Sequence, residues 1–184
     1  QVGPVLFTHR GISGPAVIKL SAWAAQALHL KNYKFNIEIN WLENHDYERV
    51  EEKIEEFRRS LAKSSVFTCP FRELPRRFWR ELLIPLNLKP DLSWAHLKER
   101  DSSAIVRSVV NCSLKVDGKT TNKEEFVTCG GVDLLEVDFR TMESKKAPNL
   151  FFAGECLDLD GVTGGFNFQS AWTTARIAAR RMSE

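Results

Sequence analysis

The sequence predicts an α+β fold in which a small, barrel-like β unit carries an inserted helical block, and a strand, a loop and a helix follow. Residues 33–41 alternate apolar and polar side chains, the pattern of a strand with one buried face. Residues from about 45 to 110 repeat apolar positions at helical spacing. Residues 149–182 place a short apolar run before a glycine-rich loop and a helix-like run. With 43% hydrophobic residues among 184, the chain can bury a core.

The first thirty residues predict a strand, a turn and a helix. Residues 4–9 form a short β-type run, and "RGISGP" after it predicts a turn. Residues 16–28 follow with apolar residues at helical spacing. Ser13 precedes Pro15 at the start of this run, so we expect Ser13 to cap the helix.

The central block predicts three helices. The first begins near Asp46 and carries Val50, Ile54 and Phe57 on one side, with charged residues on the others. The second falls within residues 72–86. The third falls within residues 89–111, capped by Asp91 or Ser93 and broken around residues 101–103.

The second of these helices also carries a basic motif, "PRRFWRE". It interleaves three arginines with Phe78 and Trp79, a pattern able to contact phosphates and stack on bases (Arg76, Arg77 and Arg80). The same spacing fits a helix with Phe78 and Leu82 in the core and the arginines on the rim.

The last third predicts short strands and a final helix. Strand-like pieces flank a turn at Asp117 and Gly118, and residues 149–153 read as a buried strand that stops on glycine. An apolar stripe then predicts the packed face of a helix (Phe168, Ala171, Trp172, Ala175, Ala179 and Met182).

Charge and cysteine usage narrow the class of protein. Twenty-six basic and 24 acidic residues leave a formal charge of +2, so no overall field attracts nucleic acid or an anionic membrane, and no run is long enough to span a bilayer. We therefore expect neither partner. The four cysteines are scattered without a CxxC pair, so we expect no metal site and free thiols. Free thiols are typical of a soluble protein in a reducing compartment, the cytoplasm or an organelle interior.

The loop "GECLDLDGVTGG" is the strongest candidate for a binding site. It joins a predicted strand to a predicted helix, whose N-terminus exposes unpaired N–H groups and partial positive charge. Carboxylates at Glu155, Asp158 and Asp160 repel bare phosphate but accept hydrogen bonds from ribose or ribitol hydroxyls. This combination favours a nucleotide-like cofactor. A tight turn with a helix cap, or a calcium loop, are the alternatives.

Three stretches carry a resemblance to a known family: "FFAGECLDLDGVTGGFNFQSAW", "GPVLFTHRGISGPAVIKLS" and "FVTCGGVDLLEVDFRTMESKKAPNLFFAGE". In this order they resemble the HI0933-like, or aminoacetone oxidase-like, FAD-dependent NAD(P)H oxidoreductases. In that family a Rossmann-type FAD domain opens with GxGxxG, is interrupted by an inserted domain and resumes near the C-terminus. This sequence contains no GxGxxG.

The resemblance therefore implies a fragment. Residues 1–127 would be the inserted, substrate-side domain, and residues 128–184 the C-terminal portion of the FAD domain. The partner would be the missing N-terminal FAD domain of the same chain.

The resemblance also implies which residues meet the cofactor. Gly154 and Glu155 would lie near the ribityl or pyrophosphate part of FAD. Four residues would lie near the flavin ring (Gly164, Gly165, Phe166 and Asn167). Gly130 and Gly131 would let the chain pass close to the cofactor, and Asp158 and Gly161 complete the expected cofactor-binding set. Thr8, His9, Ser13 and Gly14 are substrate-side candidates, but no catalytic residue is identified.

The function that the resemblance implies is transfer of reducing equivalents from NAD(P)H through FAD to an unknown small organic acceptor. The fragment alone would be inactive because the pyrophosphate-binding unit is missing. The alternative is a non-enzymatic module that binds protein or nucleic acid through its helical block.

Overall fold

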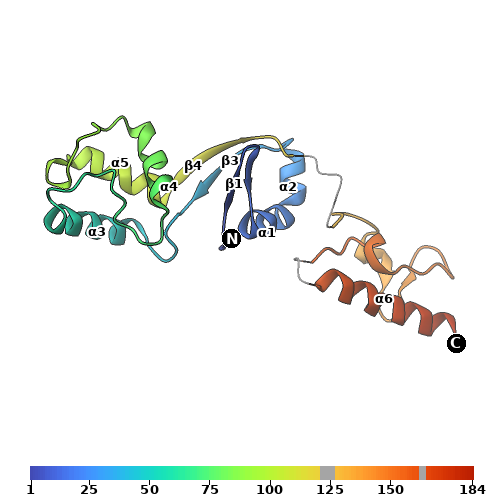
Figure 1. Cartoon of the computed structure of the whole chain (residues 1–184). Helices are drawn as coiled ribbons and strands as arrows, with labels where there is room; N and C mark the ends of the chain where they lie inside the picture. Colours follow the sequence, from blue (N-terminus) through green and yellow to red (C-terminus); the bar gives the residue numbers. More distant parts are fainter. Residues whose placement is uncertain (121–126, 162–164) are drawn as a thin grey trace. The chain divides into compact units, whose positions relative to one another are not determined.

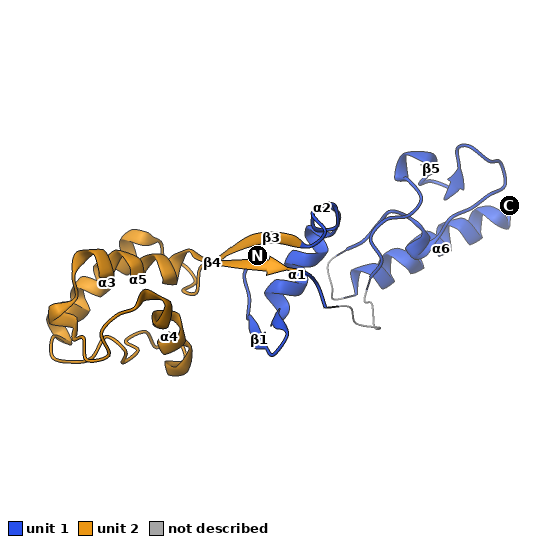
Figure 2. Ribbon diagram, turned by 90° about the horizontal axis from the view of Figure 1, so that it is seen from above, with its two compact units in different colours: residues 1–33, 118–184 blue, residues 34–117 orange. Residues whose placement is uncertain are grey.

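The computed structural model describes residues 1–120, 127–161 and 165–184, which fall into two compact units. One unit is residues 34–117, and the other combines residues 1–33 with residues 118–184 (Figure 2). The predicted mixture of helices and strands is confirmed. The described strands form three two-stranded antiparallel sheets, and none of these is closed, so the expected barrel-like closure is absent from the described residues.

The unit of residues 34–117 is built on one long strand pair. β3 (Lys34–Ile39) pairs with β4 (Cys112–Asp117) in a continuous register from Lys34 opposite Asp117 to Ile39 opposite Cys112. The half-buried residues alternate along both strands, as period-2 patterning predicts. The helical block is inserted between these two strands and returns to them (Figure 1).

The helical block contains α3 (Tyr47–Ser60), α4 (Arg76–Leu83) and α5 (Glu99–Val110), with short 3-10 turns η1 (Ile84–Leu86) and η2 (Trp94–His96). The helix α3 begins where Asp46 caps it, since the Arg49 N–H donates to Asp46 Oδ1 at 2.9 Å. Trp79, Trp94 and Leu83 lie in one fully buried core with residues of all three helices.

The core corrects the prediction for the second helix. Trp79 and Leu83 are fully buried, whereas Phe78 and Leu82 are only half-buried against that core. Positions 79 and 83 are also one helical turn apart, so the apolar spacing alone did not distinguish the two pairs.

The third predicted helix is interrupted earlier than expected. The chain leaves η2 at Leu97, which is extended, and α5 starts after Lys98, so the break is not at residues 101–103. Leu97 is buried, and its carbonyl accepts a hydrogen bond from Arg58 Nη2 at 2.9 Å. A side chain from α3 thus satisfies a backbone group that the break frees.

The N-terminal segment contains β1 (Leu6–Thr8), β2 (Gly11–Ser13), α1 (Pro15–Trp23) and α2 (Ala25–Leu30). The expected single helix is therefore divided at Ala24. Ser13 lies in β2 and does not cap α1; the N-cap is Gly14, at φ 104°. A Cβ at Gly14 would lie 2.8 Å from the Pro4 carbonyl oxygen, so only glycine fits where the strand turns into the helix.

The C-terminal segment contains η3 (Leu134–Glu136), β5 (Val137–Asp138), β6 (Glu143–Ser144), η4 (Gly154–Cys156) and α6 (Phe166–Met182). The strand expected at residues 149–153 is reduced to one isolated bridge between Phe151 and Glu143.

The helix α6 is present as predicted, but its packed face differs. Thr174 and Ala178 are buried, and Ala178 belongs to a small core with Val137 and Met142. Phe168 and Trp172, from the predicted stripe, are both 69% exposed. The helix carries apolar residues on two faces, and the described chain covers only one of them.

The buried indole of Trp79 gives a test of the helical core. Its Nε1–H donates to the Val66 carbonyl at 2.9 Å. Trp79→Phe leaves that buried carbonyl without its donor and opens a small cavity, so we expect the free energy of unfolding to fall by about 2 kcal/mol in chemical denaturation followed by circular dichroism. Trp23→Phe removes the same atoms at a position 71% exposed and should cost less than about 0.5 kcal/mol. Equal losses in the two variants would contradict the assignment of the core.

Candidate functional site

The two glycine-rich segments predicted to meet a cofactor lie side by side. Val132 and Leu157 form a parallel bridge. The Val132 N–H donates to the Cys156 carbonyl at 2.8 Å, and the Asp158 N–H donates to the Val132 carbonyl at 3.0 Å. Residues separated by about 25 positions in the sequence are therefore joined by backbone hydrogen bonds at one place.

Gly131 makes this pairing sterically possible. A Cβ at this position would lie 2.6 Å from the Cys156 carbonyl oxygen and 2.6 Å from the Leu157 carbonyl carbon, and φ is +157°. Gly130 also has a positive φ of +105°, but nothing lies within 4 Å of where its Cβ would stand. Gly131 thus lies close to the backbone of the glycine-rich loop. The expected approach of Gly130 and Gly131 to a cofactor stays a prediction.

Gly154 is held by a residue that sequence reasoning did not select. Its N–H donates to Thr174 Oγ1 at 2.9 Å, and the same hydroxyl donates to the Ser170 carbonyl at 2.8 Å. Thr174 is buried and fixes η4 against α6. The spacing of Ala171, Thr174 and Ala178 was the available signal, because small residues three and four apart allow close approach of a helix to backbone.

The start of α6 presents backbone donors. Gly165, at φ 95°, is the N-cap, and no side chain caps the helix. Asn167 clamps the end of the loop, since its Oδ1 accepts from the Gly161 N–H at 2.7 Å and its Nδ2 donates to the Gly161 carbonyl at 3.2 Å. Phe166 is exposed, and Gly164 lies outside the described residues. A helix start of this kind favours an electron-rich acceptor.

The carboxylates of the loop remain open to hydroxyl groups. Glu155 and Asp160 are exposed and Asp158 is half-buried. None of the three forms an ion pair with residues 1–120, 127–161 or 165–184. They can therefore accept hydrogen bonds from a polyhydroxyl ligand.

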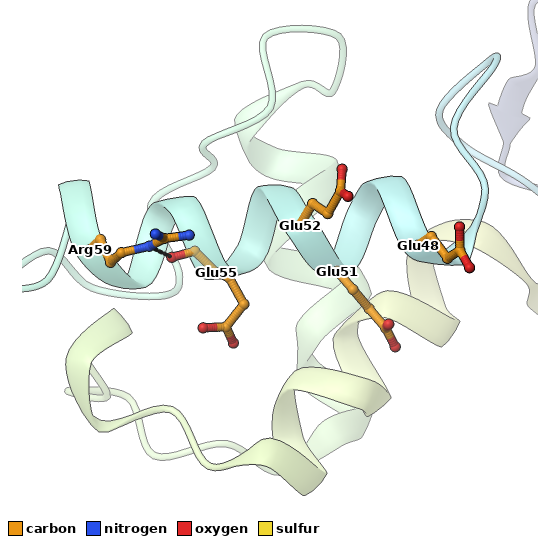
Figure 3. Close-up of a pocket in the computed structure, with 5 residues that line it drawn as sticks. All are labelled: Glu48, Glu51, Glu52, Glu55 and Arg59. Atoms are coloured by element: carbon orange, nitrogen blue, oxygen red, sulfur yellow. Dashed lines mark hydrogen bonds between the residues drawn. The ribbon is translucent and has the colours of Figure 1, made fainter.

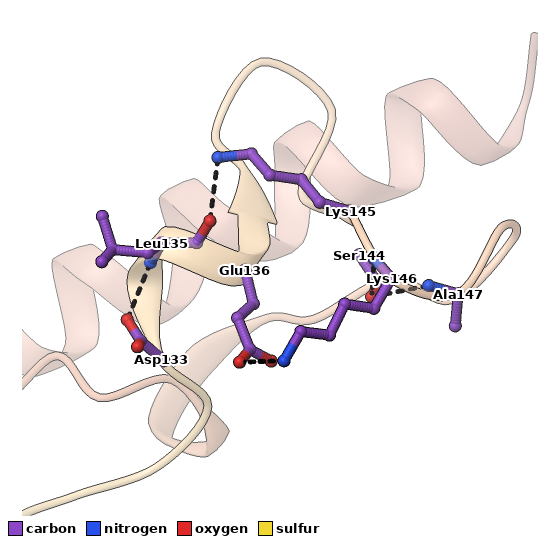
Figure 4. Close-up of polar contacts among 7 residues, drawn as sticks. All are labelled: Asp133, Leu135, Glu136, Ser144, Lys145, Lys146 and Ala147. Carbon is purple, nitrogen blue, oxygen red and sulfur yellow. Dashed lines mark hydrogen bonds and ion pairs between the residues drawn. The ribbon is translucent and has the colours of Figure 1, made fainter.

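A polar network holds the segment between the two glycine-rich stretches (Figure 4). Asp133 Oδ1 accepts from the Leu135 N–H at 2.9 Å, and Lys145 Nζ donates to the Leu135 carbonyl at 3.0 Å. Lys146 forms an ion pair with Glu136. These contacts hold the β5–β6 hairpin, which contributes Val137 and Met142 to the core beneath α6.

The substrate-side candidates lie in the β1–β2 hairpin and at the start of α1. Thr8 Oγ1 donates to the Gly11 carbonyl at 3.1 Å and accepts from the Arg10 N–H at 3.2 Å, so its hydroxyl shapes the turn. His9 is exposed in that turn. Ser13 lies in β2, and Gly14 is the N-cap of α1.

The cysteines are all free, but their surroundings differ. Burial raises the pKa of the Cys69 thiol, whose Sγ also donates to the Phe71 carbonyl at 3.2 Å. Cys129 and Cys156 are exposed. Among the described residues, no group of three or more His, Cys, Asp or Glu is placed to hold a metal ion, and no helix is long and apolar enough to cross a bilayer.

Comparison with known proteins identifies a family. The model of the HI0933-like protein barrel and H2TH domain matches residues 1–127. The ribosomal RNA dihydrouridine synthase of Escherichia coli (strain K12) is 36% identical over 176 residues, which are 96% of this chain and 41% of that protein. The Haemophilus influenzae protein of the same name is 35% identical over 97% of this chain and 42% of its own length.

A third relative acts on a different kind of molecule. The 3-dehydro-bile acid delta(4,6)-reductase of Clostridium scindens is 27% identical over 187 residues, covering 100% of this chain and 45% of the reductase. The chain therefore spans less than half the length of the curated relatives that it matches.

Two predictions from the sequence are contradicted by these relatives. The predicted function, transfer of reducing equivalents from NAD(P)H to a small organic acceptor or alternatively a non-enzymatic module, is wrong in its acceptor and in its alternative, because two relatives above 30% identity carry the name of an RNA-modifying enzyme. The prediction that no nucleic acid is a partner is wrong for the same reason. The near-neutral total charge misled the second prediction, since it averages over regions of opposite charge.

Gly131 gives a direct test of the loop geometry. Gly131→Ala places a Cβ against backbone that cannot move aside, so we expect the Val132 and Asp158 amides to exchange hydrogen at least tenfold faster. Gly118→Ala is the matched control, because Gly118 has a similar φ of +153° with nothing within 4 Å of its Cβ position. Unchanged exchange at both amides in Gly131→Ala would show that this pairing does not form.

Proposed function

The chain belongs to the HI0933-like family, and we propose that it is part of an enzyme that reduces uridine in ribosomal RNA to dihydrouridine. The observation that carries the proposal is the 36% identity to an enzyme of that name over 96% of the chain, which takes in both compact units. The reductase among the relatives supports the reaction class.

The names of the relatives describe one kind of chemistry. Dihydrouridine is uridine with hydrogen added across C5 and C6, and that double bond is conjugated to the C4 carbonyl. In a 3-dehydro-bile acid, double bonds at positions 4 and 6 are conjugated to the 3-oxo group. Such a double bond accepts a hydride at its carbon farther from the carbonyl group and a proton at its other carbon. The enzyme must therefore supply a hydride donor and a proton, and it must hold the substrate in position between them.

The residues around the glycine-rich loop fit a flavin as that donor. The first N–H groups of α6 would face its electron-rich edge, and the carboxylates of Glu155 and Asp158 would accept hydrogen bonds from its hydroxyl groups. A reduced flavin supplies the hydride. The finer cofactor assignment, FAD reduced by NAD(P)H, rests on the family resemblance.

Within this proposal the chain's residues have distinct tasks. Thr174 and Asn167 hold the backbone of Gly154 and Gly161, so both ends of residues 154–161 are fixed before a ligand binds. Gly131 joins the two glycine-rich segments. Ordering binding groups in advance lowers the entropy cost of binding and positions the reacting atoms.

We propose the domain division as predicted: residues 1–127 as the inserted domain, and residues 128–184 as a Rossmann-type part of the cofactor domain. The exposed face of α6 supports a further packing partner, because Phe168 and Trp172 present large apolar area to solvent. We propose that polypeptide outside this sequence covers this face and completes the flavin site.

A spectroscopic experiment tests the proposal. The complete protein encoded by the gene should show a visible flavin band that bleaches on anaerobic reduction. Adding ribosomal RNA that lacks dihydrouridine should restore the band while a uridine gains the mass of two hydrogens. RNA already modified at that position is the control and should leave the band bleached. A flavin that stays reduced with both RNAs would contradict the proposed substrate.

A further inference from the structure

Charge is strongly segregated within the unit of residues 34–117. Residues 43–56 hold seven acidic and two basic residues, whereas residues 57–115 hold twelve basic and five acidic residues. The acidic stretch includes most of α3, where four glutamates and Arg59 line an open hollow (Figure 3; Glu48, Glu51, Glu52 and Glu55). That face of α3 repels a polyanion.

The helix α4 presents the opposite surface. Burial of Trp79 and Leu83 turns one side of α4 into the core and directs the other side outward. The outward side lines a second hollow, formed by arginines, one glutamate and two apolar residues (Phe67, Arg76, Arg77, Arg80, Glu81 and Ile84). We call this set the α4 arginine surface.

The three arginines of the α4 arginine surface have no structural partner within the described chain. All three are exposed, and none forms an ion pair or side-chain hydrogen bond with residues 1–120, 127–161 or 165–184. In contrast, Arg58 pairs with Glu55 and also satisfies the Leu97 carbonyl. The charges on α4 therefore do not serve the fold of this unit as Arg58 does.

The position of these arginines in α4 also indicates that they do not stabilise the fold. Arg76 and Arg77 stand in the first turn, where the helix dipole disfavours positive charge, and no acidic residue accompanies them there. The helices α3 and α5 follow the opposite rule, with Glu48 and Glu99 in their first turns. An anion bound beside Arg76 and Arg77 would relieve this unfavourable placement.

The shape and composition of the surface suit RNA. Guanidinium groups bind phosphate oxygens with two donors at once, and exposed Ile84 beside half-buried Phe67 offers apolar contact to a ribose or base. We propose that the α4 arginine surface binds the phosphate backbone of the RNA substrate. This inference rests on the proposed function, and its contribution is affinity and orientation rather than chemistry.

Matched charge removals test the assignment. Arg77→Ala/Arg80→Ala removes two charges from the α4 arginine surface, and Arg49→Ala/Arg59→Ala removes two from α3. Binding of the complete protein to a fluorescent ribosomal RNA hairpin is measured by anisotropy over a series of salt concentrations. The α4 variant should bind about tenfold more weakly, and the slope of log K against log salt should flatten by about 1.4 to 1.8 for two lost phosphate contacts. The α3 variant should bind about as well as wild type, because the RNA does not contact that face.

A competition experiment and an activity assay distinguish RNA binding from binding of an acidic protein. Poly-glutamate at equal charge should not displace the hairpin; if it does, the surface binds acidic protein segments and the inference is overturned. Equal binding by wild type and the α4 variant also overturns it, and so does a wild type that binds no hairpin. Dihydrouridine formation by the complete protein is measured in parallel with the same variants. If dihydrouridine formation persists in any of these three cases, the proposed function stands and the RNA surface lies elsewhere.

Discussion

The antiparallel pairing of β3 with β4 is the constraint on which the helical unit depends. It joins residues 34–39 to residues 112–117, so both ends of the inserted block leave and return at the same place. Pairing the two ends restricts the conformations open to the block between them, so less entropy is lost when its helices pack. The buried Trp79 and Trp94 then fix α4 and η2 within that closed block. The outward face of α4, with its arginines, is a consequence of that packing.

A second constraint governs the glycine-rich loop. Two backbone segments can pair at Val132 and Leu157 only because Gly131 has no side chain, and the loop beyond them is held by Thr174 and Asn167. These contacts place Gly154 against the middle of α6 and Gly161 against its first turn. The proposed reductase chemistry requires this kind of order, because hydride transfer depends on the distance and angle between two reacting groups.

Local patterns predicted the elements, whereas packing decided their details. Alternation at residues 33–41 predicted β3, and the loop followed by a helix is where the spacing placed it. The stripe of Phe168 and Trp172 misled because α6 is apolar on two sides, and periodicity does not say which side a neighbour covers. The break at Leu97 depends on Arg58, which is distant in sequence. The sequence did not predict the proposed RNA substrate, because a cofactor loop carries no information about the acceptor and the net charge conceals the opposite charges of α3 and α4.

The central claim is that this protein makes dihydrouridine in ribosomal RNA. The most direct measurement is the dihydrouridine content of purified ribosomal RNA, by nucleoside mass spectrometry, from cells with the gene intact, deleted and restored. If the protein makes dihydrouridine, the dihydrouridine content falls on deletion of the gene and returns when the gene is restored. Unchanged dihydrouridine content in the deleted strain would contradict it.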